Sequence, residues 1–262
     1  MKRIHLFEFE DQTWFPSFLR NYVTDFLQFL SNKAKVYQSV VPEINQALKQ
    51  TNSTKIIDLG SGSGGGLLWL ATELKKENTD LKIVLTDLYP NETAFNNAAK
   101  SLPYFTYHNQ PVNATNVPET LKGFRTMFLS FHHFKPEQGV QILQNAVNSN
   151  QPIGIFEIQD RSVPSIIAML LSPISVLFTT PFIKPFSLLR LLFTYIIPII
   201  PIIVLWDGVV SSLRTYSVDE VQQLIKSVEN NENFLWQIEK KKAKMGFVIY
   251  TIGIPKKQNS LL

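Results

Sequence analysis

The chain has 262 residues, a length that fits one large α/β domain or two small domains, with a sizeable core in either case. Hydrophobic residues make up 45% and charged residues only 18%, and the nineteen phenylalanines add to this apolar composition. The chain has no cysteine, which excludes disulfides and thiolate metal sites; its four scattered histidines do not form a typical zinc pattern, so we expect no metal. The net charge of +4 is compatible with an anionic membrane surface and too weak to indicate nucleic acid as a partner.

The N-terminal part of the chain predicts helices. Residues 1–15 lack the long apolar core of a signal peptide, and we expect the protein to face the cytoplasm. Within residues 14–48, Phe18, Tyr22 and Phe26 belong to a series of apolar residues at helical spacing, and we expect residues 1–50 to form a helical cap.

Strands and helices alternate over the next hundred residues. Short buried strands are predicted at residues 55–59, 81–86, 104–108, 125–130 and 152–158, with helices at residues 65–77, 92–101 and 136–149. This alternation predicts right-handed βαβ units and a parallel sheet with helices on both faces.

The C-terminal part of the chain predicts one helix and a hairpin. Ser217 and Glu220 form a capping pattern at the start of an amphipathic helix over residues 218–229. Two strands at residues 234–239 and 247–254 follow, joined by a turn whose residues 240–244 are mostly lysine.

A glycine-rich loop, GSGSGGG at residues 60–66, follows the first predicted strand. Clustered glycines mark backbone that turns sharply or lies close to another group. Gly60, Gly62 and Gly65 match the GxGxxG pattern of dinucleotide-binding folds, in which a helix N-terminus faces a pyrophosphate. A nicotinamide cofactor is therefore one interpretation of this loop, and a flexible loop without a ligand is another.

The same loop fits a second pattern, an acidic residue two places before GxGxG: Asp58 is followed by Gly60, Gly62 and Gly64. In this motif the sequence resembles the class I S-adenosylmethionine-dependent methyltransferases. The resemblance covers residues 50–160 and 215–255. It implies an α/β fold with a Rossmann-like, mostly parallel sheet, a C-terminal antiparallel hairpin and helices on both faces. The apolar segment after the fifth strand is then a hydrophobic helical insert.

The resemblance implies S-adenosylmethionine as the cofactor. The loop backbone would pass under its methionine part, and Asp58 would hold the loop or meet its ammonium group. Asp87 ends the second strand, where a carboxylate accepts hydrogen bonds from ribose hydroxyls, as it also does in NAD enzymes. The residues expected to bind the cofactor are Asp58, Gly60, Ser61, Gly62, Gly64, Asp87 and Leu88.

Substrates of such folds lie over the carboxyl ends of the strands. The sequence SFHHF after the fourth strand lacks the Asn/Asp/Ser-Pro-Pro-aromatic motif of enzymes that methylate amino groups of bases or glutamine, which favours oxygen or carbon acceptors. His132 and His133 are candidate general bases, and Glu157 and Asp160 are candidates to orient a hydroxyl. A purely structural histidine pair, with methyl transfer by positioning alone, remains an alternative.

Three residues of the N-terminal segment belong to a region that closes over the site in many members of this superfamily: Asp11, Trp14 and Arg20. For Arg20 we favour an ordinary solvated helix face. We assign no role to His5 or His108.

Residues 162–206 are almost uncharged, with only Lys184 and Arg190. A bilayer span takes about 20 apolar residues, but prolines interrupt this segment, and the chain has to return to the same side to complete the sheet. A single span is therefore excluded. A two-span hairpin, a re-entrant or interfacial element and a soluble lid remain, and we favour a monotopic hairpin on the cytoplasmic side of the membrane, with the basic turn drawn to anionic headgroups.

We thus expect a cap at residues 1–50, a cofactor-binding domain at residues 51–161 and 207–262, and a membrane-associated insert at residues 162–206. An insert that overhangs the site predicts O- or C-methylation of a hydrophobic acceptor such as a lipid, quinone or isoprenoid-like molecule. Two alternatives are a soluble small-molecule methyltransferase, whose insert is a lid or dimer element, and a non-catalytic membrane protein that binds lipid or cofactor. A homo-oligomer is compatible with all three.

Overall fold

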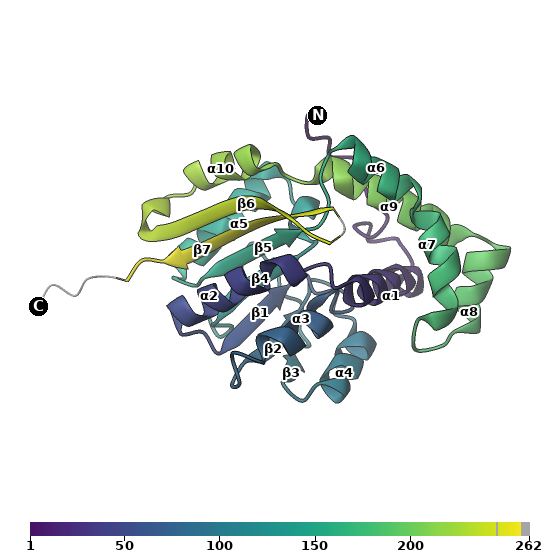
Figure 1. Ribbon diagram of the computed structural model, residues 1–262, viewed down its shortest axis with the longest axis horizontal. Helices are drawn as coiled ribbons and strands as arrows, with labels where there is room; N and C mark the ends of the chain where they lie inside the picture. Colours follow the sequence, from purple (N-terminus) through teal and green to yellow (C-terminus); the bar gives the residue numbers. More distant parts are fainter. Residues whose placement is uncertain (245, 258–262) are drawn as a thin grey trace, which may run out of the picture.

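The computed structural model describes residues 1–244 and 246–257, so the last five residues of the predicted cofactor-binding domain lie outside the described part. It contains a seven-stranded sheet in the order β3-β2-β1-β4-β5-β7-β6 (Figure 1). The strands are β1 (Lys55–Leu59), β2 (Lys82–Thr86), β3 (Phe105–Tyr107), β4 (Phe124–Phe128), β5 (Ile153–Glu157), β6 (Phe234–Lys242) and β7 (Phe247–Pro255). β1 to β5 are parallel to one another, and β7 runs antiparallel to both β5 and β6. The predicted Rossmann-like sheet with a C-terminal antiparallel hairpin is confirmed.

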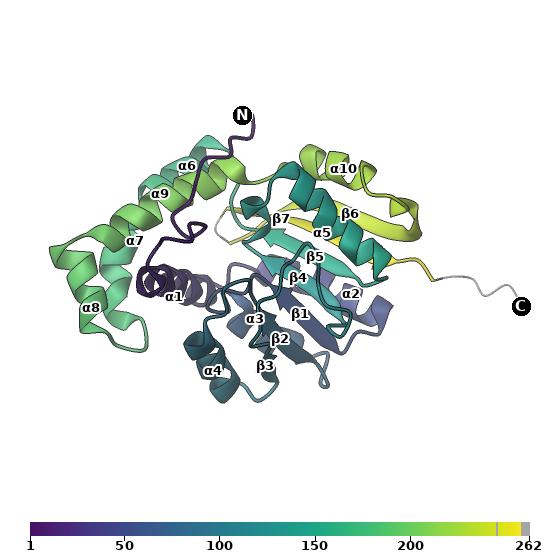
Figure 2. The ribbon, with the colours of Figure 1, turned by 180° about the vertical axis from the view of Figure 1, so that it is seen from behind.

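Helices cover both faces of the sheet (Figures 1 and 2). One face carries α2 (Val41–Thr51), α3 (Leu67–Leu74) and α4 (Glu92–Ser101), and the other carries α5 (Pro136–Asn148) and α10 (Val218–Lys226). Neighbouring strand residues point to opposite faces, so Ile56 packs in the first layer and Ile57 in the second. The predicted capping box is present at the start of α10.

Two predicted boundaries were wrong for identifiable reasons. The helix expected from Gly65 begins at Leu67, because Gly64 and Gly65 have φ values of 91° and 43°, which are not helical. β6 continues through Lys242, which pairs with Phe247, so part of the expected basic turn is strand. Lysines suit this position because β6 is the edge of the sheet, where charged side chains discourage pairing with other chains.

The apolar segment after β5 folds into short helices that are broken by turns. These elements are α6 (Val163–Leu170), α7 (Ser172–Thr179), η3 (Thr180–Phe182), α8 (Leu188–Leu191), η4 (Leu192–Ile196) and α9 (Ile199–Arg214). Prolines lie in the first turns of α6, α7 and η3, where a missing N–H costs little. In the described part of the chain, no single helix is long and apolar enough to cross a membrane. Two bent pairs reach that length and composition, α6 with α7–η3 (bent by 40°) and α8–η4 with α9 (bent by 75°).

The N-terminal segment and the apolar segment pack together, although they are far apart in the sequence. Phe15, which precedes α1 (Ser17–Ala34), and Val23 and Phe26 within it share one buried cluster with Val176 of α7 and Ile203 of α9. The chain before α1 runs along α9, and Ile4 N–H donates to the carbonyl of Leu213 at 3.1 Å. Both ribbon views place α1 and α6–α9 at the end of the sheet where the parallel strands finish (Figures 1 and 2).

Candidate active site

A cavity of about 330 Å³ lies where β1, β2 and β4 end. This volume is within the range of small-molecule sites, roughly 300–1,000 Å³. Its walls come from the glycine loop, the residues after β2 and β4, and α1 with the chain before it. Of the predicted site residues, those that line the cavity are Gly60, Ser61, Gly62, Asp87, Leu88 and His133. Asp58, Gly64, His132 and Glu157 are not part of its lining.

The glycine loop needs glycine for its backbone conformation. Gly60 and Gly62 have φ values of 67° and 54°, a region that other residues rarely adopt. A Cβ atom at Gly60 would lie 3.3 Å from Cβ of Ser130, so the loop is also packed closely against the end of β4. The backbone therefore forms this wall of the cavity, as the motif predicts.

Asp87 is tied directly to this loop. Its Oδ2 accepts a hydrogen bond from Gly62 N–H and its Oδ1 one from Tyr89 N–H, both at 2.8 Å. A carboxylate oxygen has a second lone pair, so Asp87 can still accept hydrogen bonds from two ligand hydroxyls.

Asp58 lies under the loop, away from the cavity. Its Oδ1 accepts a hydrogen bond from the Thr126 hydroxyl at 2.8 Å, and its backbone carbonyl accepts one from the Ser61 hydroxyl at 3.0 Å. Burial raises the pKa of Asp58 to about 7. Of the two roles predicted for Asp58, this position suits holding the loop.

Helix α1 fastens the loop from the opposite side. Thr24 and Ser63 hydroxyls are 2.7 Å apart, and Asn32 Nδ2 donates to the Gly65 carbonyl at 2.6 Å. Asp25 accepts from the Ser63 hydroxyl at 3.2 Å and from the Arg190 guanidinium of α8 at 2.6 Å. The apolar segment is thus linked to the glycine loop through one carboxylate.

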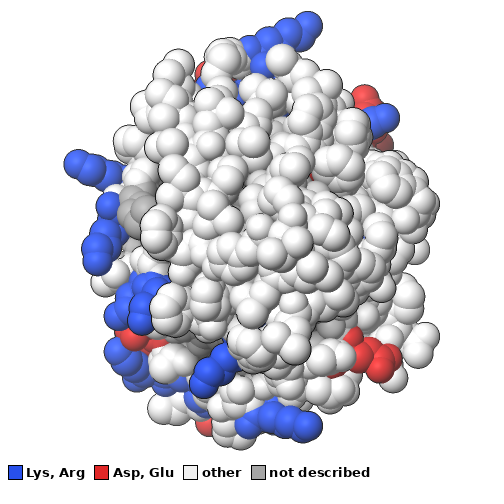
Figure 3. Space-filling view, turned by 90° about the vertical axis from the view of Figure 1, so that its right-hand side faces the viewer, with Lys and Arg blue, Asp and Glu red and all other residues white. Residues whose placement is uncertain are grey.

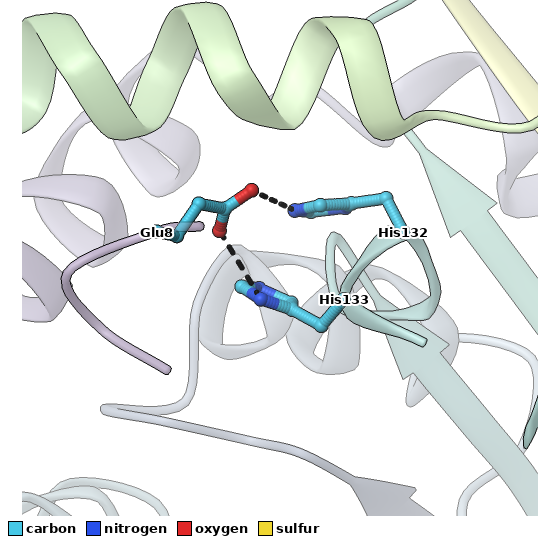
Figure 4. Close-up of side chains that lie close together, drawn as sticks. All are labelled: Glu8, His132 and His133. Atoms are coloured by element: carbon cyan, nitrogen blue, oxygen red, sulfur yellow. Dashed lines mark ion pairs between the residues drawn. The ribbon is translucent and has the colours of Figure 1, made fainter. Parts of the chain in front are cut away.

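The two adjacent histidines have different surroundings. His132 is 1% exposed, and its Nδ1 lies 2.9 Å from Glu157 Oε2. His133 lines the cavity, and its Nδ1 lies 2.8 Å from Asp11 Oδ1. The same nitrogen lies 3.1 Å from Glu8 Oε2 (Figure 4). Both histidines belong to the short 3₁₀ turn η2 (Phe131–His133), and their rings lie side by side, with centroids 4.3 Å apart. The structure therefore places one histidine in the core and the other at the cavity.

A buried ion-pair network surrounds His133. Arg214 of α9 lies 3.2 Å from Glu8 Oε1 and 2.5 Å from Asp11 Oδ2. Burial alone would lower the pKa of His133. The carboxylates of Glu8 and Asp11 outweigh this effect and raise the pKa to about 10. For Asp11, burial alone would raise the pKa, but hydrogen bonds from His133 and Arg214 hold the pKa well below its ordinary value. The network therefore favours a protonated His133.

Glu8, His132 and His133 also place three potential metal-ligand atoms within 4.8 Å of one another. Nε2 of His132 is buried without a hydrogen bond and lies 3.9 Å from Glu8 Oε1. However, Glu8 is already paired with Arg214, and Nδ1 of His133 with Asp11, so a cation would have to displace both interactions. We interpret this cluster as an ion-pair network.

Stability should fall with rising pH, because the native state holds acidic groups in their neutral form. Burial raises the pKa of Glu10 to about 8 and that of Asp207 to about 7, so the folded chain keeps protons that the unfolded chain releases above its carboxyl pKa of about 4.5. We expect a lower melting temperature at pH 8.5 than at pH 5.5. Glu10→Gln should reduce this difference and the exposed control Glu119→Gln should not; equal pH dependence in both variants would contradict the prediction.

The position predicted for Arg20 was wrong, and the structure brings further residues to the site that the sequence did not single out. Arg20, expected on a solvated face, lines the cavity, and its guanidinium lies 5.5 Å from the ring centroid of Tyr89. Glu8 and Glu10 were also missed; the only local signal is an acidic cluster, FEFED, within an aromatic segment. Asp160 instead pairs with Lys240 and accepts from Ser162 at the start of α6, and Trp14 is 66% exposed outside the cavity lining.

Comparisons with known proteins support the fold. No protein-family model and no curated protein matches the sequence. The plantazolicin methyltransferase BpumL in complex with SAH matches with a TM-score of 0.52 and 16% identity, covering 92% of this chain and 88% of that chain. The methyltransferase domain of bacterial CtHen1 matches with a TM-score of 0.51 and 13% identity, covering 84% and 99%. An O-methyltransferase family protein from Burkholderia thailandensis matches with a TM-score of 0.50 and 11% identity, covering 87% and 59%. The chain has the Rossmann-like fold of the class I S-adenosylmethionine-dependent methyltransferases.

Proposed function

We propose that the protein is an S-adenosylmethionine-dependent methyltransferase that acts on an oxygen or carbon atom of a hydrophobic acceptor. The observation that carries the proposal is the hydrogen bond from Gly62 N–H to Asp87. It brings the positive-φ glycine loop and the acid after β2 to the wall of one cavity. The complex of the structurally similar BpumL with SAH supports the choice of cofactor.

The residues of the cavity suit this cofactor. The backbone of the loop leaves room for a ligand, since a Cβ atom at Gly65 would meet nothing within 4 Å. Asp87 would accept hydrogen bonds from the ribose hydroxyls, and Leu88 beside it is exposed and lines the cavity. The bound cofactor supplies a methyl group that is already activated as a sulfonium.

His133 is the residue that we propose takes a proton from the acceptor. Its Nδ1 is held by Asp11 and Glu8, so in the neutral ring, which forms at high pH, the other nitrogen is the one that accepts a proton. The two carboxylates fix the orientation of the ring and stabilise the imidazolium that forms. His132 and Glu157 are buried behind His133, and their hydrogen bonds would hold η2 in place.

The hydrophobic character of the acceptor is inferred from the surroundings of the cavity. Leu88 and Tyr89 line it and are 45% and 50% exposed, and the apolar helices α6–α9 lie at the same end of the sheet. We propose a lipid, quinone or isoprenoid-like molecule as the class of acceptor.

Cofactor binding is tested by calorimetry with S-adenosylhomocysteine. Asp87→Asn removes the charge that strengthens hydrogen bonds to the ribose, an effect of about 1.5–3 kcal/mol, so we expect roughly 10- to 150-fold weaker binding. The control is Asp80→Asn, an exposed acid before β2. Absence of binding by the unchanged protein, or binding of NADH in its place, would refute the proposed cofactor.

The acceptor is tested separately, by incubating the protein with methyl-labelled S-adenosylmethionine and a total lipid extract. We expect the label in the organic phase, in a product that the Asp87→Asn variant forms much more slowly. If the label is found only in water-soluble products, the assignment as a methyltransferase stands and the proposed hydrophobic acceptor is excluded.

A further inference from the structure

The helices α6–α9 present a continuous apolar surface, which we call the apolar face: the exposed large apolar side chains of residues 163–206. Seventeen such side chains are 36–75% exposed, with Phe178 at 73% and Leu188 at 75%. Figure 3 shows this side of the molecule as a broad surface without charged atoms. Soluble proteins rarely expose apolar patches beyond a few hundred Å², and larger ones mark surfaces that another molecule covers.

We propose that the apolar face docks into one leaflet of an anionic lipid membrane. The first argument is the scarcity of exposed charge in residues 163–206, which contain no Asp or Glu. Arg190 is turned inward: it is 2% exposed, pairs with Asp25 and donates to the carbonyl of Ile183 at 3.1 Å. Lys184 is the exposed charge of the segment, and a lysine can bury its stem while its ammonium reaches the headgroups.

The second argument is the shape of the segment. The two long apolar stretches are bent by 40° and 75°, and both ends of the segment return to the same sheet. Phe178, Phe182 and Phe186 lie on and between the bent elements and are 65–73% exposed. Such a segment is suited to lie within the interface, with these phenylalanines as its anchors.

The third argument separates a membrane from a second copy of the chain. Lys and Arg side chains gather along part of the border of the apolar face (Figure 3). Lys240 of β6 pairs with Asp160, beside the start of α6, so the basic end of the edge strand lies next to this face. A twofold axis that packs these basic parts of the border against each other would oppose like charges, whereas anionic headgroups would oppose them with opposite charge.

The experiment is co-sedimentation of the full-length protein with phosphatidylcholine vesicles, with and without phosphatidylglycerol. We expect binding to both and at least fivefold stronger partitioning into the anionic vesicles. The triple variant Phe178→Ser/Phe182→Ser/Phe186→Ser should partition at least tenfold less. Leu235→Ser is the matched control, because Leu235 is 58% exposed at the start of β6, outside the apolar face, and it should bind as the unchanged protein does.

Folding of the variants is verified by the melting temperature and by affinity for S-adenosylhomocysteine, so failure of docking is distinguishable from failure of the proposed function. Lys184→Glu, a single surface change, should lower the preference for anionic vesicles about fivefold or more. Unchanged partitioning of the triple variant would overturn the proposal. A protein that ignores vesicles and sediments as a dimer in buffer would also overturn it and assign the apolar face to a second copy.

Discussion

His133→Asn is expected to lower kcat by about 10²- to 10⁴-fold, the usual contribution of a general base, while affinity for S-adenosylhomocysteine stays within about threefold. Asparagine is smaller but keeps a polar N–H next to Asp11 and Glu8, and it cannot take a proton from the acceptor. The measurement is single-turnover methyl transfer under saturating cofactor at high pH, where the neutral ring of His133 is populated. His108→Asn is the control, because His108 lies outside the cavity lining.

The same residue makes a pH prediction. With a pKa of about 10 in the free protein, His133 is protonated at neutral pH, so activity should rise with pH until the neutral form dominates. The sulfonium of S-adenosylmethionine carries a positive charge that opposes the imidazolium, so bound S-adenosylmethionine should lower the pKa of His133 more than the uncharged sulfur of S-adenosylhomocysteine does. Titration of the ring by NMR with each ligand measures this difference. Full activity of His133→Asn, or an identical pKa with both ligands, would remove His133 as the base.

Arg214→Met is expected to lower the free energy of unfolding by about 3–5 kcal/mol, the cost of removing one partner from a buried ion-pair network, because the carboxylates of Glu8 and Asp11 then share the single charge of His133. Arg214 is 2% exposed and Glu8 1%, so water cannot replace the lost cation. Chemical denaturation measures the loss. In the double variant Arg214→Met/Glu8→Gln the excess negative charge is absent, since His133 then faces one carboxylate, and part of the stability should return.

The matched control for this prediction is Arg161→Met. Arg161 pairs with Glu220 at 2.5 Å, but the Glu220 side chain is 31% exposed and water can solvate it. We therefore expect a loss of about 1 kcal/mol or less for the control. A loss of the same size in both variants would show that the charge on Glu8 is not what Arg214 stabilises.

Most of the sheet could be predicted from the sequence because its signals are local. Apolar runs of strand length that end in glycine or an acid predict β1 and β2, and this alone brings Gly62 and Asp87 to one edge of the sheet. The end of β6 could not be predicted in this way, because Lys240 and its neighbours resemble a turn in sequence and are strand only through pairing with β7.

The half of the site around His133 depends on contacts that leave no local pattern. Glu8 meets Arg214 about 200 residues further along the chain, and neither residue belongs to a recognisable motif. His132 and His133 are neighbours of the same type, so only the η2 turn and the buried Glu157 decide which of them reaches the cavity. The sequence predicts the helix that contains Arg20 but not what this helix packs against. The position of α1 beside the glycine loop, which brings Arg20 to the cavity, depends on tertiary contacts.

The packing of the N-terminal segment along α9 has a consequence for biosynthesis. Glu8 leaves the ribosome early, whereas Arg214 follows only after roughly 10–40 s at typical elongation rates of 5–20 residues per second. During that interval the nascent chain holds an acidic, phenylalanine-rich segment without its partner, and a sheet edge that still awaits β7. We therefore expect newly made chains to engage chaperones until release from the ribosome, when β7 can enter the sheet between β5 and β6.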